Sequence, residues 1–136
     1  MNRDALYAVL ANYLEALNAG DASRVNWAAS PLNSENNVML EVGDGLWGTI
    51  LRLGDYQLKF ADTSTNQVGY FGTVHEAIEE SAFTLRLKVN DQGQVTESEM
   101  VVVRQSDSGI KFENCRYWDK PILNAGVEAP VSRAEM

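Results

Sequence analysis

The chain has 136 residues, of which 45% are hydrophobic and 9% aromatic, and this is enough to bury the core of one domain. Its net charge of −8 repels phosphate backbones and anionic membranes, so we expect neither nucleic acid nor a membrane as a partner. The single Cys115 and the single His75 exclude a disulfide framework and a zinc site of cysteine and histidine ligands. We therefore expect no metal and no cofactor. The absence of a long apolar run or a signal-peptide pattern predicts a cytoplasmic protein.

An amphipathic helix is predicted at the start of the chain. Its apolar residues recur every three to four positions and form one stripe: Leu6, Val9, Leu10, Tyr13, Leu14 and Leu17. Gly20 ends this helix, and Asp21 can cap a second short helical turn that runs to about Trp27. The asparagine, serine and proline residues of segment 30–37 predict a loop.

From Val38 onward the period of the hydrophobic residues changes from 3.6 to 2, which is typical of strands. The predicted strands cover residues 38–42, 56–61, 68–76, 81–90 and 94–105, with a brief helix or bent connection over 46–53. Short polar turns join them, so we expect antiparallel pairing. One long helix on a curved antiparallel sheet is an α+β fold, predicted here as a single domain over residues 1–136 that ends in a last strand or tail over 106–136.

The hairpin around residues 90–93 sets the predicted register of the last two strands. Its sequence, Asn-Asp-Gln-Gly, is the clearest turn in the chain. If these four residues form the loop, the numbers of any two residues that pair across the hairpin add up to 183. Arg86 then lies opposite Glu97, and Thr84 lies opposite Glu99.

The two faces of strand 94–105 predict a partner for the sheet. Val101 and Val103 share a face with glutamates, whereas a sheet face that meets only water alternates more cleanly. We expect this face to be covered by a second copy, which gives a two-fold homodimer. The competing expectation is that the tail around Tyr117 and Trp118 covers it within one chain.

Three stretches resemble the nuclear transport factor 2-like superfamily: SENNVML at 34–40 leading to GDGLW at 43–47, FAD at 60–62 through Gly69, and LRLKV at 85–89. The resemblance covers roughly residues 3–105 and points to a subgroup of functionally uncharacterised bacterial and fungal domains. It implies a cone, in which helices pack in the concave side of a strongly bent sheet and leave a pocket at the open end. Ketosteroid isomerases, SnoaL-like polyketide cyclases, limonene epoxide hydrolase and non-catalytic scaffolds share this fold, so the fold alone leaves the function open.

Binding of a small hydrophobic, partly oxygenated molecule is the leading functional hypothesis. Tryptophan and tyrosine combine an apolar ring with one polar group, and pockets for flat apolar ligands are built from such side chains. The predicted binding residues are Tyr13, Trp27, Trp47, Phe60, Asp62, Tyr70 and Trp118.

An enzyme is the alternative hypothesis: an isomerase, cyclase or hydrolase that uses general acid–base catalysis. The resemblance to ketosteroid isomerases implies Tyr13 as a hydrogen-bond donor and places the base at Glu41 or Val42. Asp62 shares the phase of the apolar residues of its strand, so it could also serve as a base with a raised pKa, or it could cap the loop 63–65. A non-catalytic dimeric assembly module is the third hypothesis.

Overall fold

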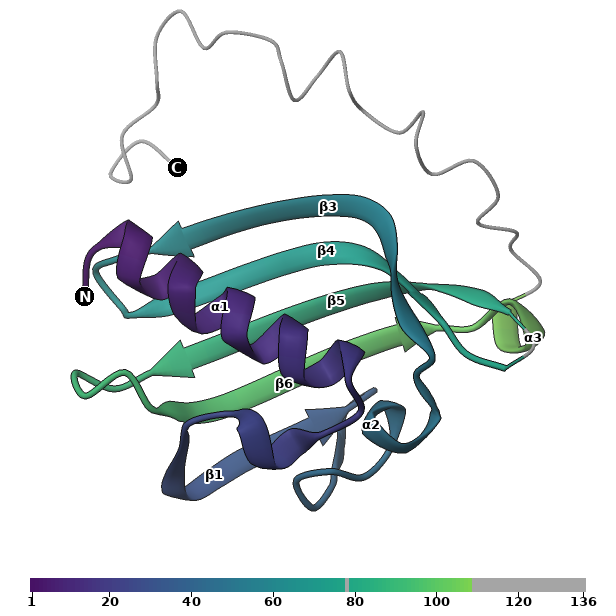
Figure 1. Ribbon diagram of the computed structural model, residues 1–136, viewed down its shortest axis with the longest axis horizontal. Helices are drawn as coiled ribbons and strands as arrows, with labels where there is room; N and C mark the ends of the chain where they lie inside the picture. Colours follow the sequence, from purple (N-terminus) through teal and green to yellow (C-terminus); the bar gives the residue numbers. More distant parts are fainter. Residues whose placement is uncertain (78, 109–136) are drawn as a thin grey trace, which may run out of the picture.

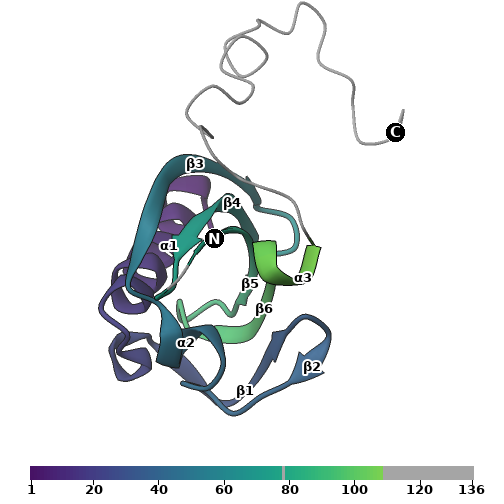
Figure 2. The same cartoon turned by 90° about the vertical axis from the view of Figure 1, so that its right-hand side faces the viewer.

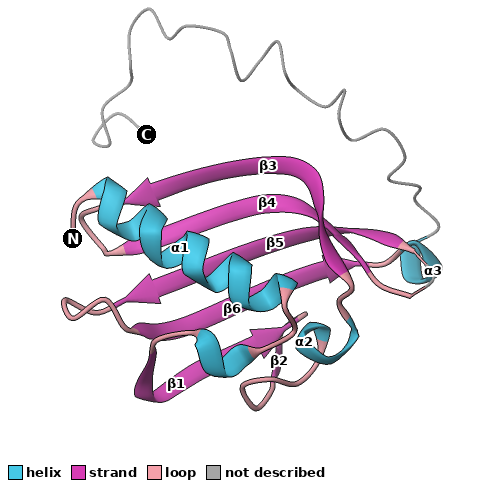
Figure 3. Ribbon diagram, viewed as in Figure 1, coloured by secondary structure: helices cyan, strands magenta, loops and turns pink. Residues whose placement is uncertain are grey.

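The computed structural model describes residues 1–77 and 79–108. The elements in chain order are α1 (Arg3–Asn18), η1 (Ala22–Arg24), β1 (Trp27–Glu35), β2 (Val38–Met39), α2 (Leu46–Thr49), β3 (Arg52–Asp62), β4 (Gln67–His75), β5 (Glu80–Val89), β6 (Val95–Val103) and α3 (Gln105–Ser108). The strands form one sheet in the order β2-β1-β6-β5-β4-β3, and α1 crosses one face of it (Figure 1). The predicted α+β architecture is confirmed (Figure 3).

Helix α1 lies in the curve of the sheet. Asn2 caps its start, because the Asn2 Oδ1 accepts a hydrogen bond from the backbone N–H of Ala5 at 2.8 Å. Gly20 follows its end with a φ of 64°, a conformation that favours glycine. The sheet curls around the helix (Figure 2), so we call the face toward α1 the concave face and the opposite one the outer face. The buried residues of α1 are Leu6, Leu10, Tyr13, Ala16 and Leu17.

Strands β3 to β6 form the predicted antiparallel meander. Strict alternation in β5 puts Phe83, Leu85 and Leu87 in the core, while Arg86 between them lies on the outer face. The core between α1 and the concave face is completed from the neighbouring strands by Val68, Tyr70, Val74, Met100 and Val102.

The predicted register of the β5–β6 hairpin is wrong by two residues. Arg86 lies opposite Glu99, and Lys88 lies opposite Glu97. One cause is the loop, since Asn90 donates its backbone N–H to the carbonyl oxygen of Gln94 and leaves only three residues between them. The other cause is a register shift next to Val89, which is typical of a β-bulge.

Strand β1 replaces most of the loop that we expected over residues 30–37. It pairs in parallel with β6, so the expectation of a purely antiparallel sheet is wrong as well. Asn36 extends this pairing beyond the strand: its side chain accepts from the backbone N–H of Val102 at 2.9 Å and donates to the carbonyl oxygen of Val102 at 3.1 Å. Strand β2 covers only part of the predicted strand 38–42. Of the two alternatives for residues 46–53, the structure has a brief helix, α2, over the first four residues.

Candidate functional site

Tyr13 lies in the centre of the core and is fully buried. Its phenol oxygen lies 2.7 Å from the hydroxyl oxygen of Ser98 on β6, and it is 4.0 Å from the sulfur of Met100. Burial raises the pKa of Tyr13 far above its ordinary value, and the hydrogen bond to Ser98 offsets only part of that rise. Tyr13 therefore stays protonated and neutral.

Three of the other predicted binding residues lie on the same side of the sheet as Tyr13. The rings of Trp27 and Trp47 pack edge-on against Tyr13, with centroids 5.7 Å and 5.2 Å away. Trp27 donates its indole N–H to the carbonyl oxygen of Ala22 at 2.9 Å. Tyr70 packs against the ring of Phe83. These aromatic side chains fill the inside of the curve.

Phe60 and Asp62 lie on the outer face, so they do not join the aromatic residues around Tyr13. Phe60 is opposite Gly69 and Asp62 is opposite Gln67, which is the phase of β3 that turns away from α1. The carboxylate of Asp62 accepts hydrogen bonds from the backbone and side chain of Ser64 and from the hydroxyl of Thr65. This is the loop-capping arrangement, an Asx-turn.

The three predicted catalytic residues do not meet in one hollow. Tyr13 is sealed in the core, Asp62 is on the outer face, and Glu41 is exposed in the loop between β2 and α2. Trp118 lies outside the described residues, as do Tyr117 and Cys115.

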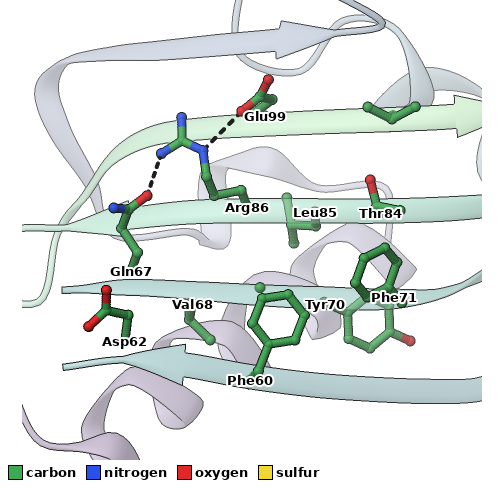
Figure 4. A pocket seen from close by; sticks show the side chains of 12 residues that line it. Phe60, Asp62, Gln67, Val68, Tyr70, Phe71, Thr84, Leu85, Arg86 and Glu99 are labelled. Carbon is green, nitrogen blue, oxygen red and sulfur yellow. Dashed lines mark hydrogen bonds and ion pairs between the residues drawn. The ribbon is translucent and has the colours of Figure 1, made fainter. Parts of the chain in front are cut away.

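A wide hollow on the outer face, here called the outer-face hollow, combines apolar side chains with an ion-pair network. Its volume is about 470 Å³, and its apolar rim consists of Phe60, Phe71 and Val101. The guanidinium of Arg86 extends between the side chains of Gln67 and Glu99, at 3.0 Å and 2.9 Å, and it also pairs with Glu97 at 2.9 Å (Figure 4). The predicted ion pair with Glu97 is thus present, although Glu97 lies diagonally across the hairpin.

A second hollow, here called the α1–β3 groove, runs along the concave side between the helix and the edge strand. Its volume is about 340 Å³. The helix contributes Tyr7, Leu10, Ala11 and Leu14, and the sheet contributes Leu53, Gln57, Lys59 and Tyr70. The ammonium nitrogen of Lys59 lies 4.7 Å from the centroid of the Tyr7 ring, which is a cation–π contact. Burial raises the pKa of Tyr70 to about 12.

A largely buried ion-pair cluster lies where β1, β4 and β6 end, and it was not predicted. Arg104 donates to both carboxylate oxygens of Glu76, at 2.7 Å and 3.0 Å, and to Glu35 at 3.2 Å. Glu35 in turn accepts from the backbone N–H of Leu46 at 2.7 Å, and Glu76 from the hydroxyl of Thr49 at 2.6 Å. One signal was present in the sequence: Arg104 shares the strand phase of the buried residues of β6.

The described residues show no group of three histidine, cysteine, aspartate or glutamate side chains placed to hold one metal ion. No helix within residues 1–77 and 79–108 is both long and apolar enough to cross a membrane.

Neither a protein-family model nor a curated protein matches this sequence. Solved structures do match it. A protein of unknown function with a cystatin-like fold from Methylobium petroleophilum PM1 superposes with a TM-score of 0.61 and 12% identity over 97% of each chain. An NTF2-like protein of unknown function from Cytophaga hutchinsonii gives a TM-score of 0.59 and 9% identity over 77% of this chain and 95% of its own. The chain has the nuclear transport factor 2-like fold.

The same fold forms part of a larger protein that was solved with a ligand. The orange carotenoid protein of Anabaena sp. PCC 7120, in a structure binding canthaxanthin, gives a TM-score of 0.53 and 15% identity. The match covers 71% of this chain but 35% of that protein. At these identities the likeness shows the fold, and the residues of each site have to be argued from this chain alone.

Proposed function

We propose that this protein binds a small hydrophobic, partly oxygenated molecule in the α1–β3 groove. The observation that carries the proposal is the composition of the groove. Leucine and tyrosine side chains form its walls, and its rim carries the amide of Gln57, the ammonium of Lys59 and the phenol of Tyr7. Its volume, about 340 Å³, falls within the range of small-molecule sites. The groove lies on the concave side, and of the predicted binding residues that the structure describes, only Tyr70 lines it.

The side chains below the groove make it a preformed site. Leu10 and Tyr70 form the floor of the groove and are only 1% and 2% exposed, so the core holds them in place. Tyr70 lies across Gly72, where any larger side chain would collide with its ring. A rigid floor reduces the entropy that ligand binding costs. The canthaxanthin-bound structure supports a hydrophobic ligand only at the level of the fold.

The test uses the neutral probe decan-1-ol and two matched variants on the exposed side of α1. Ala11→Phe fills the groove, whereas Ala8→Phe places the same ring on the helix outside it. We expect NMR shift changes at Tyr7, Leu14 and Leu53 in the native protein and in Ala8→Phe, and a loss of binding in Ala11→Phe. If the probe binds none of the three proteins, or binds all three equally, the groove is not the site.

A second candidate function is assembly into a homodimer through the outer face. Phe60, Phe71 and Val101 are 51%, 44% and 39% exposed and border one hollow, and together they form an apolar surface that is unusual to leave open to water. The rings of Phe60 and Phe71 lie 5.7 Å apart and make a common platform. The ion pairs of Arg86 beside it can form the polar rim that interfaces have.

Sedimentation velocity at micromolar concentration tests the dimer. We expect the native chain to sediment at twice 15.0 kDa and Val101→Asp to sediment as a folded monomer. Leu51→Asp is the matched control, because Leu51 is 64% exposed and takes no part in the outer-face hollow. A native species of 15.0 kDa would reject the dimer.

A further inference from the structure

The α1–β3 groove differs in charge from the other hollows of the protein. Lys59 is the one charged side chain among the residues that line it. Each of the three other hollows that we compared contains more carboxylates than cations: the outer-face hollow, the hollow beside the β2–α2 loop, and the hollow between α2 and α3. In a chain with a net charge of −8, this groove is therefore a local exception.

The ammonium group of Lys59 forms no ion pair within the described residues. Its partner there is the face of the Tyr7 ring, which holds the ammonium at the rim of the groove without neutralising it. By contrast, Lys88 on the outer face pairs with Glu97 at 3.2 Å. The β-strand register explains the position of Lys59: it lies beside Tyr70, so its stem starts on the concave face.

Hydrogen-bonding groups surround the same rim. Gln57 precedes Lys59 by two residues and so lies on the same face of β3, and Tyr7 lies across the groove on α1. An amide and an ammonium can both donate to one carboxylate, while the leucines below can contact only an apolar body. The groove thus has a cationic, donor-rich rim above an apolar floor.

We propose that the ligand of this groove is an amphiphile with a single carboxylate, whose head group is held by Lys59 and Gln57 and whose apolar body lies along Leu10, Leu14 and Leu53. This inference rests on the proposed function, because it specifies the chemistry of the same site. It adds a requirement for negative charge that a merely hydrophobic groove does not have.

Decanoate and decan-1-ol separate the two claims, because they share an apolar chain and differ in head group. Both are titrated by NMR at low ionic strength and neutral pH, below the micellar concentration, into the native protein, Lys59→Met, Lys88→Met and Ala11→Phe. Methionine keeps most of the side-chain stem and removes the charge. We expect decanoate to bind more tightly than decan-1-ol, and Lys59→Met to weaken decanoate by about three- to tenfold without affecting decan-1-ol. Lys88→Met should change neither.

Each other result decides against the carboxylate preference alone or against both claims. One such result is that both probes bind the native protein and that Lys59→Met changes their affinities equally or not at all. In that case the groove is an apolar site, so the carboxylate preference is rejected while the proposed function stands. If decanoate is weakened as much by Lys88→Met as by Lys59→Met, the attraction is a general charge effect, and the preference is again rejected. If neither probe binds, or Ala11→Phe leaves both unchanged, the proposed function fails and this inference fails with it.

Discussion

The phenol oxygen of Tyr13 and the hydroxyl oxygen of Ser98 lie 2.7 Å apart inside the core, where the two residues are 0% and 2% exposed. The bond ties the middle of α1 to β6, although 85 residues separate the two in the sequence. Because water does not reach either group, loss of one partner leaves the other without compensation. This pair therefore helps the buried apolar residues of α1 to hold the helix on the sheet.

Removing one member of this pair should destabilise the fold. We expect Tyr13→Phe and Ser98→Ala each to lower the free energy of unfolding by about 1–2 kcal/mol. The double variant should lose less than the sum of the two, by about 1 kcal/mol, because no unpaired hydroxyl remains. Urea unfolding of all four proteins measures the coupling, and strict additivity would show that the bond contributes nothing.

Arg104 should matter far more than an exposed arginine. Its side chain is 24% exposed and compensates two glutamates that are 9% and 10% exposed. Arg104→Met leaves Glu35 and Glu76 uncompensated and is expected to cost about 2–3 kcal/mol of unfolding free energy.

The matched control for Arg104 is Arg24, whose pair with Glu15 is 44% and 72% exposed. Arg24→Met should cost less than about 1 kcal/mol. Equal losses in the two variants would contradict the structural role of the buried cluster.

Stability should fall in acid through two glutamates. Burial acts to raise the pKa of Glu76, but hydrogen bonds from Arg104 and Thr49 outweigh it and the pKa is lowered. The hydrogen bond from Arg86 likewise lowers the pKa of Glu97. A carboxyl group with a lowered pKa in the folded state stabilises the fold fully above its unfolded pKa, about 4.3, and this contribution is lost as the pH falls through the folded pKa.

Urea unfolding at a series of pH values checks this pH dependence. We expect the free energy of unfolding to decline below about pH 4.3, and the decline to be shallower in Glu76→Gln and in Glu97→Gln, because neither amide titrates. If both variants keep the full slope of the native protein, other carboxyl groups carry the acid sensitivity.

Two glycines should respond to alanine in opposite directions. A Cβ at Gly54 would collide with the side chain of Thr73, which is fully buried, whereas a Cβ at Gly48 in α2 meets nothing within 4 Å. Gly54→Ala is expected to destabilise the protein by about 1–3 kcal/mol. Gly48→Ala should stabilise it by about 0.5–1 kcal/mol, because alanine favours the helix. Thermal unfolding measures both, and a stable Gly54→Ala protein would contradict the packing described here.

Local patterns predicted the parts of the fold whose partners are close in the sequence. Helix α1 buries most of the predicted stripe, while Val9 and Leu14 of that stripe are half-buried. Strands β3 to β6 form the predicted antiparallel meander, and the polar segments 62–67 and 90–93 mark the turns after β3 and β5. Strand β1 was missed because its burial does not alternate and its paired residues in β6 lie 65 to 68 positions later along the chain. The predicted hairpin register was wrong because the loop is one residue shorter than expected and because a bulge leaves no reliable mark in the sequence.

The candidate site was predictable only in part, and the reason is geometric. Alternation divides β3 into two phases but does not say which of them faces the helix. The apolar phase with Phe60 turned out to lie on the outer face, and the phase with Gln57 and Lys59 lies in the groove. Polar residues of an edge strand can face the helix if the helix does not cover them completely, as Gln57 and Lys59 do here. The sequence of β3 alone does not show which of its two faces lies toward α1.

The parallel pairing of β1 with β6 has a consequence for the protein during its synthesis. Strand β1 leaves the ribosome early, but of the strands it joins, only β2 is available until β6 has also emerged. The side chain of Asn36 likewise forms its two hydrogen bonds only after Val102, 66 residues later, has been synthesised. The nascent chain therefore carries an open edge on β1 until β6 has been synthesised, and β1 joins the rest of the sheet only when this last strand arrives.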